Sequence, residues 1–289
     1  MKKLYIIGNG FDLHHGFRTR YEHFKLYLQD NKKDELLSFL MEYFEIEDDD
    51  TWKSFEENLG NFDFDLFYDN RNNINADSYN LSWSSSYGLL DELQEDSKYF
   101  ISELRNEFEA WISEVDISFT GSLLDLSANQ LFLTFNYTRT LEDLYNIDPS
   151  NILHIHGIVN NGDLIFGHGE KQENVVEIDE NGDSLRTIWT DAEDASKTIK
   201  TSLYKNVDEM LFENCTFFNR CVVNSIYVFG HSYSLIDSEY FRFIYKSNET
   251  AKWFVSFHGE NDKDNFEKLA SLIGLSNSQY VFINIKDCV

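Results

Sequence analysis

The chain has 289 residues, of which 42% are hydrophobic and 16% aromatic, so it can bury a large core and is not a disordered chain. Its formal net charge of -27 repels phosphate backbones at long range, which argues against broad nucleic-acid binding but allows a local site for one small anion. The three cysteines, Cys215, Cys221 and Cys288, form no CxxC pair, which argues against a disulfide framework and a cysteine-rich zinc site.

The first predicted element is a strand at residues 4–7, a continuous apolar run that ends at Gly8. Such a run is typical of a central parallel strand that is buried on both faces, and we expect a helix to begin near Phe11. The run is too short for a signal peptide or a membrane span. We therefore expect a cytoplasmic protein with no membrane partner.

The next predicted elements are helices, because residues 21–115 carry apolar side chains at helical spacing on both sides of a polar stretch at 70–80. Roughly a hundred residues between two strands is too long for an ordinary crossover. We therefore predict a helical insertion at residues 21–127. Residues 30–69 carry fourteen Asp and Glu against three Lys, which indicates a solvated acidic face or a contact for a partner protein or a second copy of the chain.

Strands and helices alternate in the remainder of the chain. The predicted strands are at residues 131–135, 152–155, 225–229, 253–257 and 280–283. The predicted helices are at residues 139–145, at 192–218 and between the last two strands. The turn residues at 160–163 predict a hairpin whose second strand is 164–166, and the polar residues 170–191 predict a loop that could serve as a lid.

This order predicts an α/β fold: a Rossmann-like doubly wound, mostly parallel sheet with a large helical insertion after the first strand. The nucleotide-binding core would comprise residues 1–20 and 128–289, within a single compact domain overall. In such sheets a ligand binds beyond the carboxyl ends of the strands. Four polar motifs follow predicted strands and are therefore candidate site elements.

The first motif is the turn Gly8-Asn9-Gly10, with Asp12 just behind it. Glycines allow a sharp turn and a close approach to an anion, and the amides at the start of the next helix then face a phosphate. The third glycine of the dinucleotide fingerprint is absent, because Leu13 occupies its place. The alternatives are a tight turn without a ligand, and an Asp12 that complements the helix dipole.

The second motif contains Asn136, whose amide can orient a ribose, an amide or a water. The alternative is a helix N-cap formed by Asn136 or Thr138, which we favour when this motif is taken alone.

The third motif, His154-Ile155-His156, offers three interpretations. His156 lies at the strand end and would suit a general base, because an imidazole titrates near neutral pH. A metal pair would need His168 and His231 as distant ligands, since no carboxylate lies within the motif. Two structural histidines are the third interpretation.

The fourth motif is Gly230-His231-Ser232, followed by Ser234 and Asp237. The serine hydroxyls could bind a phosphate or a ribose, and Asp237 could cap the following helix. A Ser-His-Asp triad is disfavoured, because adjacent residues seldom form one and the chain has no nucleophile elbow.

Together these motifs resemble the AbiH-type bacteriophage abortive infection proteins. The resemblance rests on residues 4–13 with His15-Gly16, on Phe135-Asn136-Tyr137-Thr138 with Leu141-Glu142, on His154-Ile155-His156-Gly157, on Gly167-His168 and on Gly230-His231-Ser232 with Asp237. The family is distantly similar to sirtuin-like domains, which implies a Rossmann-like NAD site. The resemblance implies that Gly8, Asn9 and Gly10 contact the pyrophosphate. It implies that Asn136 and His156 match the sirtuin asparagine and catalytic histidine, and that Gly230 and Ser232, with His231 between them, lie near the ribose.

The expected function is therefore an abortive infection effector that binds NAD and hydrolyses it to ADP-ribose and nicotinamide, with no metal. The candidate catalytic residues are His156 and Asn136. The chain lacks a four-cysteine zinc module, so protein deacylation is not expected. Two alternatives stay open: a non-catalytic module that senses a nucleotide or binds a protein, and a metal-dependent hydrolase or nuclease that uses the histidines.

Overall fold

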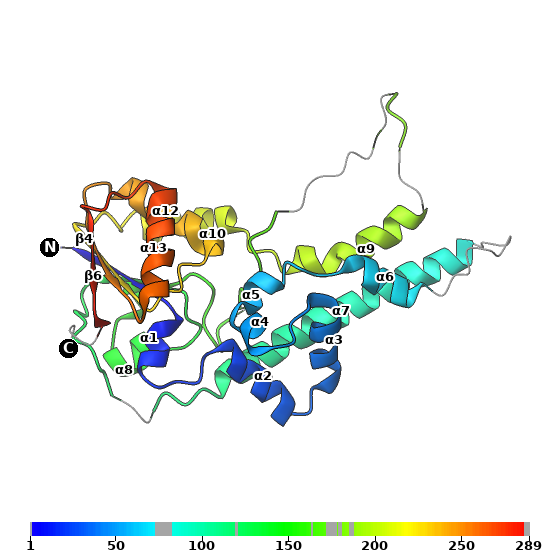
Figure 1. The fold of residues 1–289 in the computed structure, drawn as a ribbon, viewed down its shortest axis with the longest axis horizontal. Helices are drawn as coiled ribbons and strands as arrows, with labels where there is room; N and C mark the ends of the chain where they lie inside the picture. The colour runs from blue at the N-terminus through cyan, green and yellow to red at the C-terminus, as the bar shows by residue number, and fades with distance from the viewer. Residues whose placement is uncertain are drawn as a thin grey trace. The chain divides into compact units, whose positions relative to one another are not determined.

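The computed structural model describes residues 2–72, 83–118, 121–162, 164–171, 178, 181–184 and 188–285. It contains one six-stranded sheet in which every pair of neighbouring strands is parallel (Figure 1). The strands lie in the order β3-β2-β1-β4-β5-β6 across the sheet. Their bounds are β1 (Lys3–Ile7), β2 (Leu131–Thr134), β3 (Ile152–His154), β4 (Ser225–Phe229), β5 (Lys252–Ser256) and β6 (Tyr280–Ile283). This is the strand order of a Rossmann fold, and it confirms the predicted α/β class.

Alternating side chains of the central strand enter two separate cores. Leu4 and Ile6 of β1 belong to one hydrophobic cluster, and Tyr5 and Ile7 belong to the other. All four are at most 4% exposed, as a strand covered on both faces requires.

Helices cover each face of the sheet. On the Leu4 side the core includes side chains of α10 (Val207–Glu213), α12 (Ser238–Ser247) and α13 (Glu260–Ile273). On the Tyr5 side it includes side chains of α1 (Asn9–His14) and α8 (Thr140–Tyr145). The sheet is therefore doubly wound, as predicted.

The described chain divides into two compact units. The first contains the sheet and comprises residues 1–23, 109–165 and 206–289, and the second comprises residues 24–108 and 166–205. The helices of the second unit, two of which extend into the first, are α2 (Tyr21–Asp30), α3 (Asp34–Phe44), α4 (Asp49–Lys53), α5 (Phe55–Asn58), α6 (Phe64–Arg71), α7 (Trp83–Ser113) and α9 (Ile188–Ser202). Three short helical segments complete the first unit: η1 (Pro149–Asn151), α11 (Cys215–Phe218) and η2 (Leu235–Asp237). Most of the insertion expected at residues 21–127 thus lies in the second unit, together with residues 166–205.

Two local expectations are wrong. Residues 164–166 form no strand, because Ile165 N–H bonds the His156 carbonyl at 2.8 Å without continuing into a ladder. The expected helix at 192–218 is three helices, α9, α10 and α11, because the chain leaves α9 to pair with His168. His168 N–H bonds the Leu203 carbonyl at 3.0 Å, and Lys205 N–H bonds the His168 carbonyl at 2.8 Å.

Some expectations fall on residues that the structure does not describe. Residues 73–80 of the polar stretch, Asp163 of the turn and Cys288 lie outside the described residues, as do 172–177, 179–180 and 185–187 of the expected loop.

Candidate functional site

Two glycine turns meet at the point in the sheet where the strand order reverses. Strands β1 and β4 are neighbours, and the connections that leave them run to opposite sides of the sheet. A ligand of a doubly wound fold binds beyond the carboxyl ends of strands at such a point. Gly8-Asn9-Gly10 follows β1 and Gly230-His231-Ser232 follows β4, so the structure brings these two predicted motifs together.

The glycines of these turns are required by close backbone packing. Gly10 N–H donates to the Gly230 carbonyl at 2.7 Å. A Cβ at Gly8 would lie 2.6 Å from the His231 Cα, and one at Gly10 would lie 2.7 Å from the Gly230 Cα. Asn9 also has an internal role, because its Nδ2 donates to the Thr19 carbonyl at 2.7 Å. Packing thus accounts for the glycines without a ligand, and their contact with a pyrophosphate stays a prediction.

Asp12 is a buried carboxylate that is held by two hydroxyl groups. Thr138 Oγ1 donates to Oδ2 at 2.6 Å, and Thr140 Oγ1 donates to Oδ1 at 2.8 Å. Burial raises the pKa of Asp12 to about 6, and the hydrogen bonds from Thr138 and Thr140 and the nearby Asn136 oppose the shift. Asp12 therefore links α1 to the first residue of α8 and to the segment before it, a role that sequence reasoning missed.

Asn136 has a fixed backbone and a buried side chain. Its N–H donates to Thr134 Oγ1 at 3.1 Å, and its carbonyl accepts from His154 Nδ1 at 3.1 Å. The residue is 6% exposed. Among the described residues, neither Oδ1 nor Nδ2 makes a hydrogen bond of normal geometry, although the amide lies near enough to the Asp12 carboxylate to lower its pKa. The capping alternative is wrong, because α8 is preceded by Arg139 and has no side-chain cap.

His154 and His156 do not form a metal pair, because each ring faces a different carboxylate. His154 Nε2 lies 3.1 Å from Glu142 Oε1. His156 Nε2 lies 3.8 Å from Asp237 Oδ1. The sequence analysis named both carboxylates but did not predict that either would face a histidine.

Asp237 lies between two histidines. Its Oδ2 is 3.4 Å from His231 Nε2, and its Oδ1 faces His156. His231 Nδ1 accepts a hydrogen bond from Tyr233 N–H at 2.8 Å, so the ring proton is on Nε2 and points at the carboxylate. The expected cap is wrong, since Asp237 precedes α12 without bonding its amides. The short spacing of six residues between His231 and Asp237 was the sequence signal that could have predicted their contact.

The serines have other roles than a triad. Ser232 is exposed, and Ser234 accepts from Ile236 N–H at 3.4 Å in η2. Both nitrogens of His231 are already engaged, by Tyr233 N–H and by Asp237. No ring nitrogen remains for Ser232, which rules out the disfavoured triad.

The metal-dependent interpretation gains no support. Within the part of the chain that the structure describes, no group of three or more His, Cys, Asp or Glu could hold a metal ion. His168 belongs to the second unit, where its Nε2 lies 2.8 Å from the Lys200 carbonyl and its Nδ1 accepts from Glu170 N–H at 3.2 Å.

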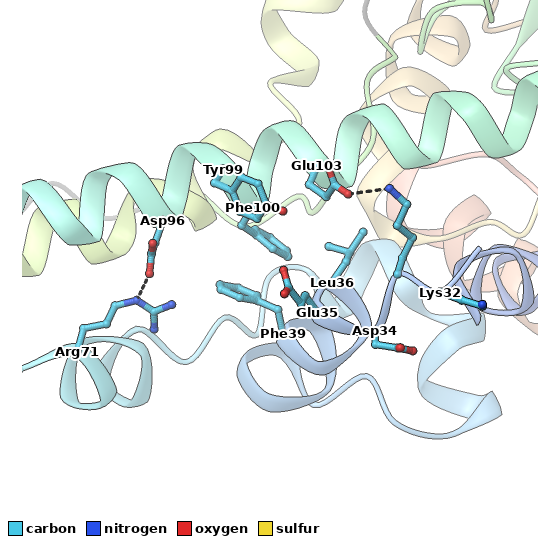
Figure 2. Close-up of a pocket in the computed structure, with 11 residues that line it drawn as sticks. Lys32, Asp34, Glu35, Leu36, Phe39, Arg71, Asp96, Tyr99, Phe100 and Glu103 are labelled. Carbon is cyan, nitrogen blue, oxygen red and sulfur yellow. Dashed lines mark hydrogen bonds and ion pairs between the residues drawn. The ribbon is translucent and has the colours of Figure 1, made fainter. Parts of the chain in front are cut away.

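A pocket of about 500 Å³ in the second unit contains none of the predicted site residues (Figure 2). It lies between side chains of α3, α6 and α7. Its cations face carboxylates: Arg71 Nε lies 2.6 Å from Asp96 Oδ2, and Lys33 Nζ lies 3.0 Å from Glu103 Oε1. Because Lys33 and Arg71 pair with carboxylates and Asp34 and Glu35 add negative charge to the lining, this pocket does not favour an anion.

Comparison with known proteins gives one match. The family model for bacteriophage abortive infection AbiH matches residues 4–257, which include all the site residues discussed above. No curated protein and no solved structure matches the chain. None of the helices in the described residues has the length and apolar character needed to cross a membrane.

Proposed function

The chain belongs to the bacteriophage abortive infection AbiH family, and on that premise we propose that it binds NAD and hydrolyses the bond between nicotinamide and ribose. The family implies a role in abortive phage infection. NAD as the ligand and hydrolysis as the reaction are our proposal. The reacting groups would be Asn136 and His156, at the carboxyl edge of the sheet.

The observation that carries the proposal is the buried amide of Asn136, which makes no hydrogen bond of normal geometry and has the Asp12 carboxylate as its near neighbour. Leaving a buried polar group unsatisfied costs about 1–3 kcal/mol. A buried polar group that lacks a well-formed hydrogen bond within the protein therefore points to a bound water or ligand, and a water or a substrate hydroxyl would satisfy the amide.

His156 lies close to the same segment. The rings of both neighbours of Asn136 contact it, with centroid distances of 5.2 Å for Phe135 and 6.3 Å for Tyr137. Its Nε2 faces Asp237, whose carboxylate would stabilise a protonated imidazole. A base with such a partner can accept a proton and hold it.

In the proposed reaction, Asn136 orients a water and His156 accepts its proton. The water oxygen bonds to C1′ of the ribose as the bond from C1′ to nicotinamide breaks, and the bonding electrons leave with nicotinamide. One NAD and one water give ADP-ribose, nicotinamide and a proton. General base help of this kind contributes about 10²–10⁴-fold.

The glycine turns would contact the rest of the nucleotide. Ser232 is exposed beside Gly230, which supports a contact with a ribose or a phosphate. The pyrophosphate would contact Gly8, Asn9 and Gly10 only through polar groups that are not used in the hydrogen bonds within the protein. His231 supports Asp237 in this scheme.

The test is NAD consumption by purified protein, with products separated by chromatography, beside His156→Ala and a chelator control. His258→Ala is the matched variant, because His258 follows the end of β5, which β1 and β4 separate from the strand that leads to Asn136. The proposal is supported if wild type and His258→Ala produce ADP-ribose and nicotinamide, with or without chelator, and His156→Ala does not. Stabilisation by NAD without any product would replace it with a nucleotide-sensing module.

A further inference from the structure

We infer that His154 and Glu142 are positioning residues: a doubly protonated His154, held by Glu142, fixes the backbone of Asn136 and so aims its amide. This inference rests on the proposed function, because it assigns how the site presents the residue that orients the water. Neither His154 nor Glu142 touches the reacting atoms in this account.

The hydrogen bonds of His154 require two ring protons. Nδ1 lies 3.1 Å from the Asn136 carbonyl oxygen, and Nε2 lies 3.1 Å from Glu142 Oε1. A carbonyl oxygen only accepts hydrogen bonds, and so does an ionised carboxylate. A neutral imidazole has one N–H and could serve only one of these acceptors.

Glu142 is the ionised partner. Burial pushes the pKa of Glu142 up, but the hydrogen bond and the charge of His154 outweigh it and hold the pKa below its ordinary value. The side chains of His154 and Glu142 are 10% and 8% exposed. Among the described residues, Glu142 Oε2 has no hydrogen-bond partner, so its charge is balanced mainly at His154.

Two further charges act on this pair. Asp12 lies near enough to His154 for the imidazolium charge to lower its pKa, against the larger effect of burial. Arg139 acts on Glu142 in the same direction as His154 does. Of the two carboxylates, Glu142 makes the direct contact with the His154 ring.

The consequence for Asn136 is a backbone held at both polar groups by side chains. Thr134 accepts from its N–H, and His154 donates to its carbonyl. The preceding residue is anchored to β1, because Phe135 N–H donates to the Ile7 carbonyl at 2.9 Å. With the backbone fixed, the amide is preorganised, and a misplacement of about 1 Å at such a group can cost about 10²-fold in rate.

The deciding variant is Glu142→Gln, and its matched control is Asp143→Asn. Asp143 lies on the same helix, but it is 45% exposed and faces Arg139 at 3.6 Å. The neutral amide in Glu142→Gln holds a ring with two N–H groups less strongly than the carboxylate does, so the bond from His154 to the Asn136 carbonyl weakens. We expect the kcat of Glu142→Gln for NAD to fall about 10- to 100-fold, with KM within about twofold. Asp143→Asn should behave as wild type. An unchanged kcat in Glu142→Gln, or a loss that lies in KM instead, would overturn the inference.

A readout without NAD separates this inference from the proposed function. In ¹⁵N NMR spectra at pH 7.5, assigned with His154→Gln, both ring nitrogens of wild-type His154 should be protonated, and one in Glu142→Gln. The side-chain amide signals of Asn136 should move in Glu142→Gln and not in Asp143→Asn. A wild-type ring with one proton overturns the inference whatever the activity. The expected spectra without NAD turnover in any variant would leave the positioning intact and reject the proposed reaction.

Discussion

His231 and Asp237 face each other across 3.4 Å, with the ring proton of His231 fixed on the nitrogen that points at the carboxylate. His231 is thereby a donor that holds Asp237, and the other carboxylate oxygen of Asp237 is directed at His156. The late glycine motif and the His156 turn are joined through this one carboxylate, which makes Asp237 the residue on which the proposed base depends.

Asp237→Asn is expected to lower kcat for NAD at least about 10²-fold, because an amide cannot stabilise the protonated His156 as a carboxylate does. Glu239→Gln is the control on the helix that follows, since Glu239 is 51% exposed and pairs with Arg242. Steady-state kinetics at pH 7.5 give the comparison. Equal losses in the two variants would remove Asp237 from the mechanism.

Asp12→Asn tests the buried carboxylate through the pH dependence of stability. The pKa of Asp12 is raised from 3.8 to about 6 in the folded chain, so the native state binds more protons than the unfolded state between these values. Stability from this group is therefore present at low pH and is lost as the pH rises, by about 3 kcal/mol in total and about 1 kcal/mol between pH 5 and 7.

The free energy of unfolding of Asp12→Asn, relative to wild type, should accordingly increase by about 1 kcal/mol between pH 5 and 7. Urea titrations at each pH measure it, and Asp264→Asn, an exposed change on α13, is the control. A difference that stays constant with pH, or that decreases, contradicts the buried titrating carboxylate.

Gly8→Ala tests the packing of the two turns. Gly8 and Gly259 both precede a helix with extended backbone, but a Cβ at Gly8 would lie 2.6 Å from the His231 Cα, whereas one at Gly259 would have no atom within 4 Å. We expect Gly8→Ala to destabilise the chain by about 1–3 kcal/mol and Gly259→Ala to change little, measured by urea unfolding. Equal effects would show that the turns do not pack as described.

Lys205→Met tests the buried ion pair of the second unit. Lys205 Nζ contacts Glu56, and the two side chains are 1% and 17% exposed. Removing the cation should cost about 3–5 kcal/mol, because the half-buried Glu56 carboxylate loses its direct cation, and adding Glu56→Gln should restore much of it. Lys200→Met removes the more exposed pair with Glu170 and should cost at most about 1 kcal/mol. Thermal unfolding distinguishes the cases, and a double variant no better than Lys205→Met would contradict the pairing.

The strands and their carboxyl ends could be predicted from the sequence, because a strand buried on both faces is a short continuous apolar run. Residues at strand ends then share one edge of a parallel sheet, which placed Asn136, His156 and His231 in one region. The doubly wound class followed from the alternation of strands and helices.

The partners of these residues could not be predicted in the same way, because they depend on strand order. Asp12 meets Thr138 across 126 positions of sequence, and no local pattern marks that contact. The hairpin failed for a related reason. Asn160 and Gly162 adopt the positive φ values of turn residues, 63° and 111°, but the turn does not decide whether the next segment pairs as a strand.

The most direct test of the central claim is Asn136→Ala, measured both for nicotinamide release from NAD and for thermal stability. If the amide of Asn136 serves hydrolysis, wild type releases nicotinamide and ADP-ribose in equal amounts, and Asn136→Ala loses at least about 10²-fold of that rate. Its unfolding temperature should change little, since no hydrogen bond of normal geometry is lost. Unchanged turnover in Asn136→Ala, or no nicotinamide from the wild-type protein, would contradict the account.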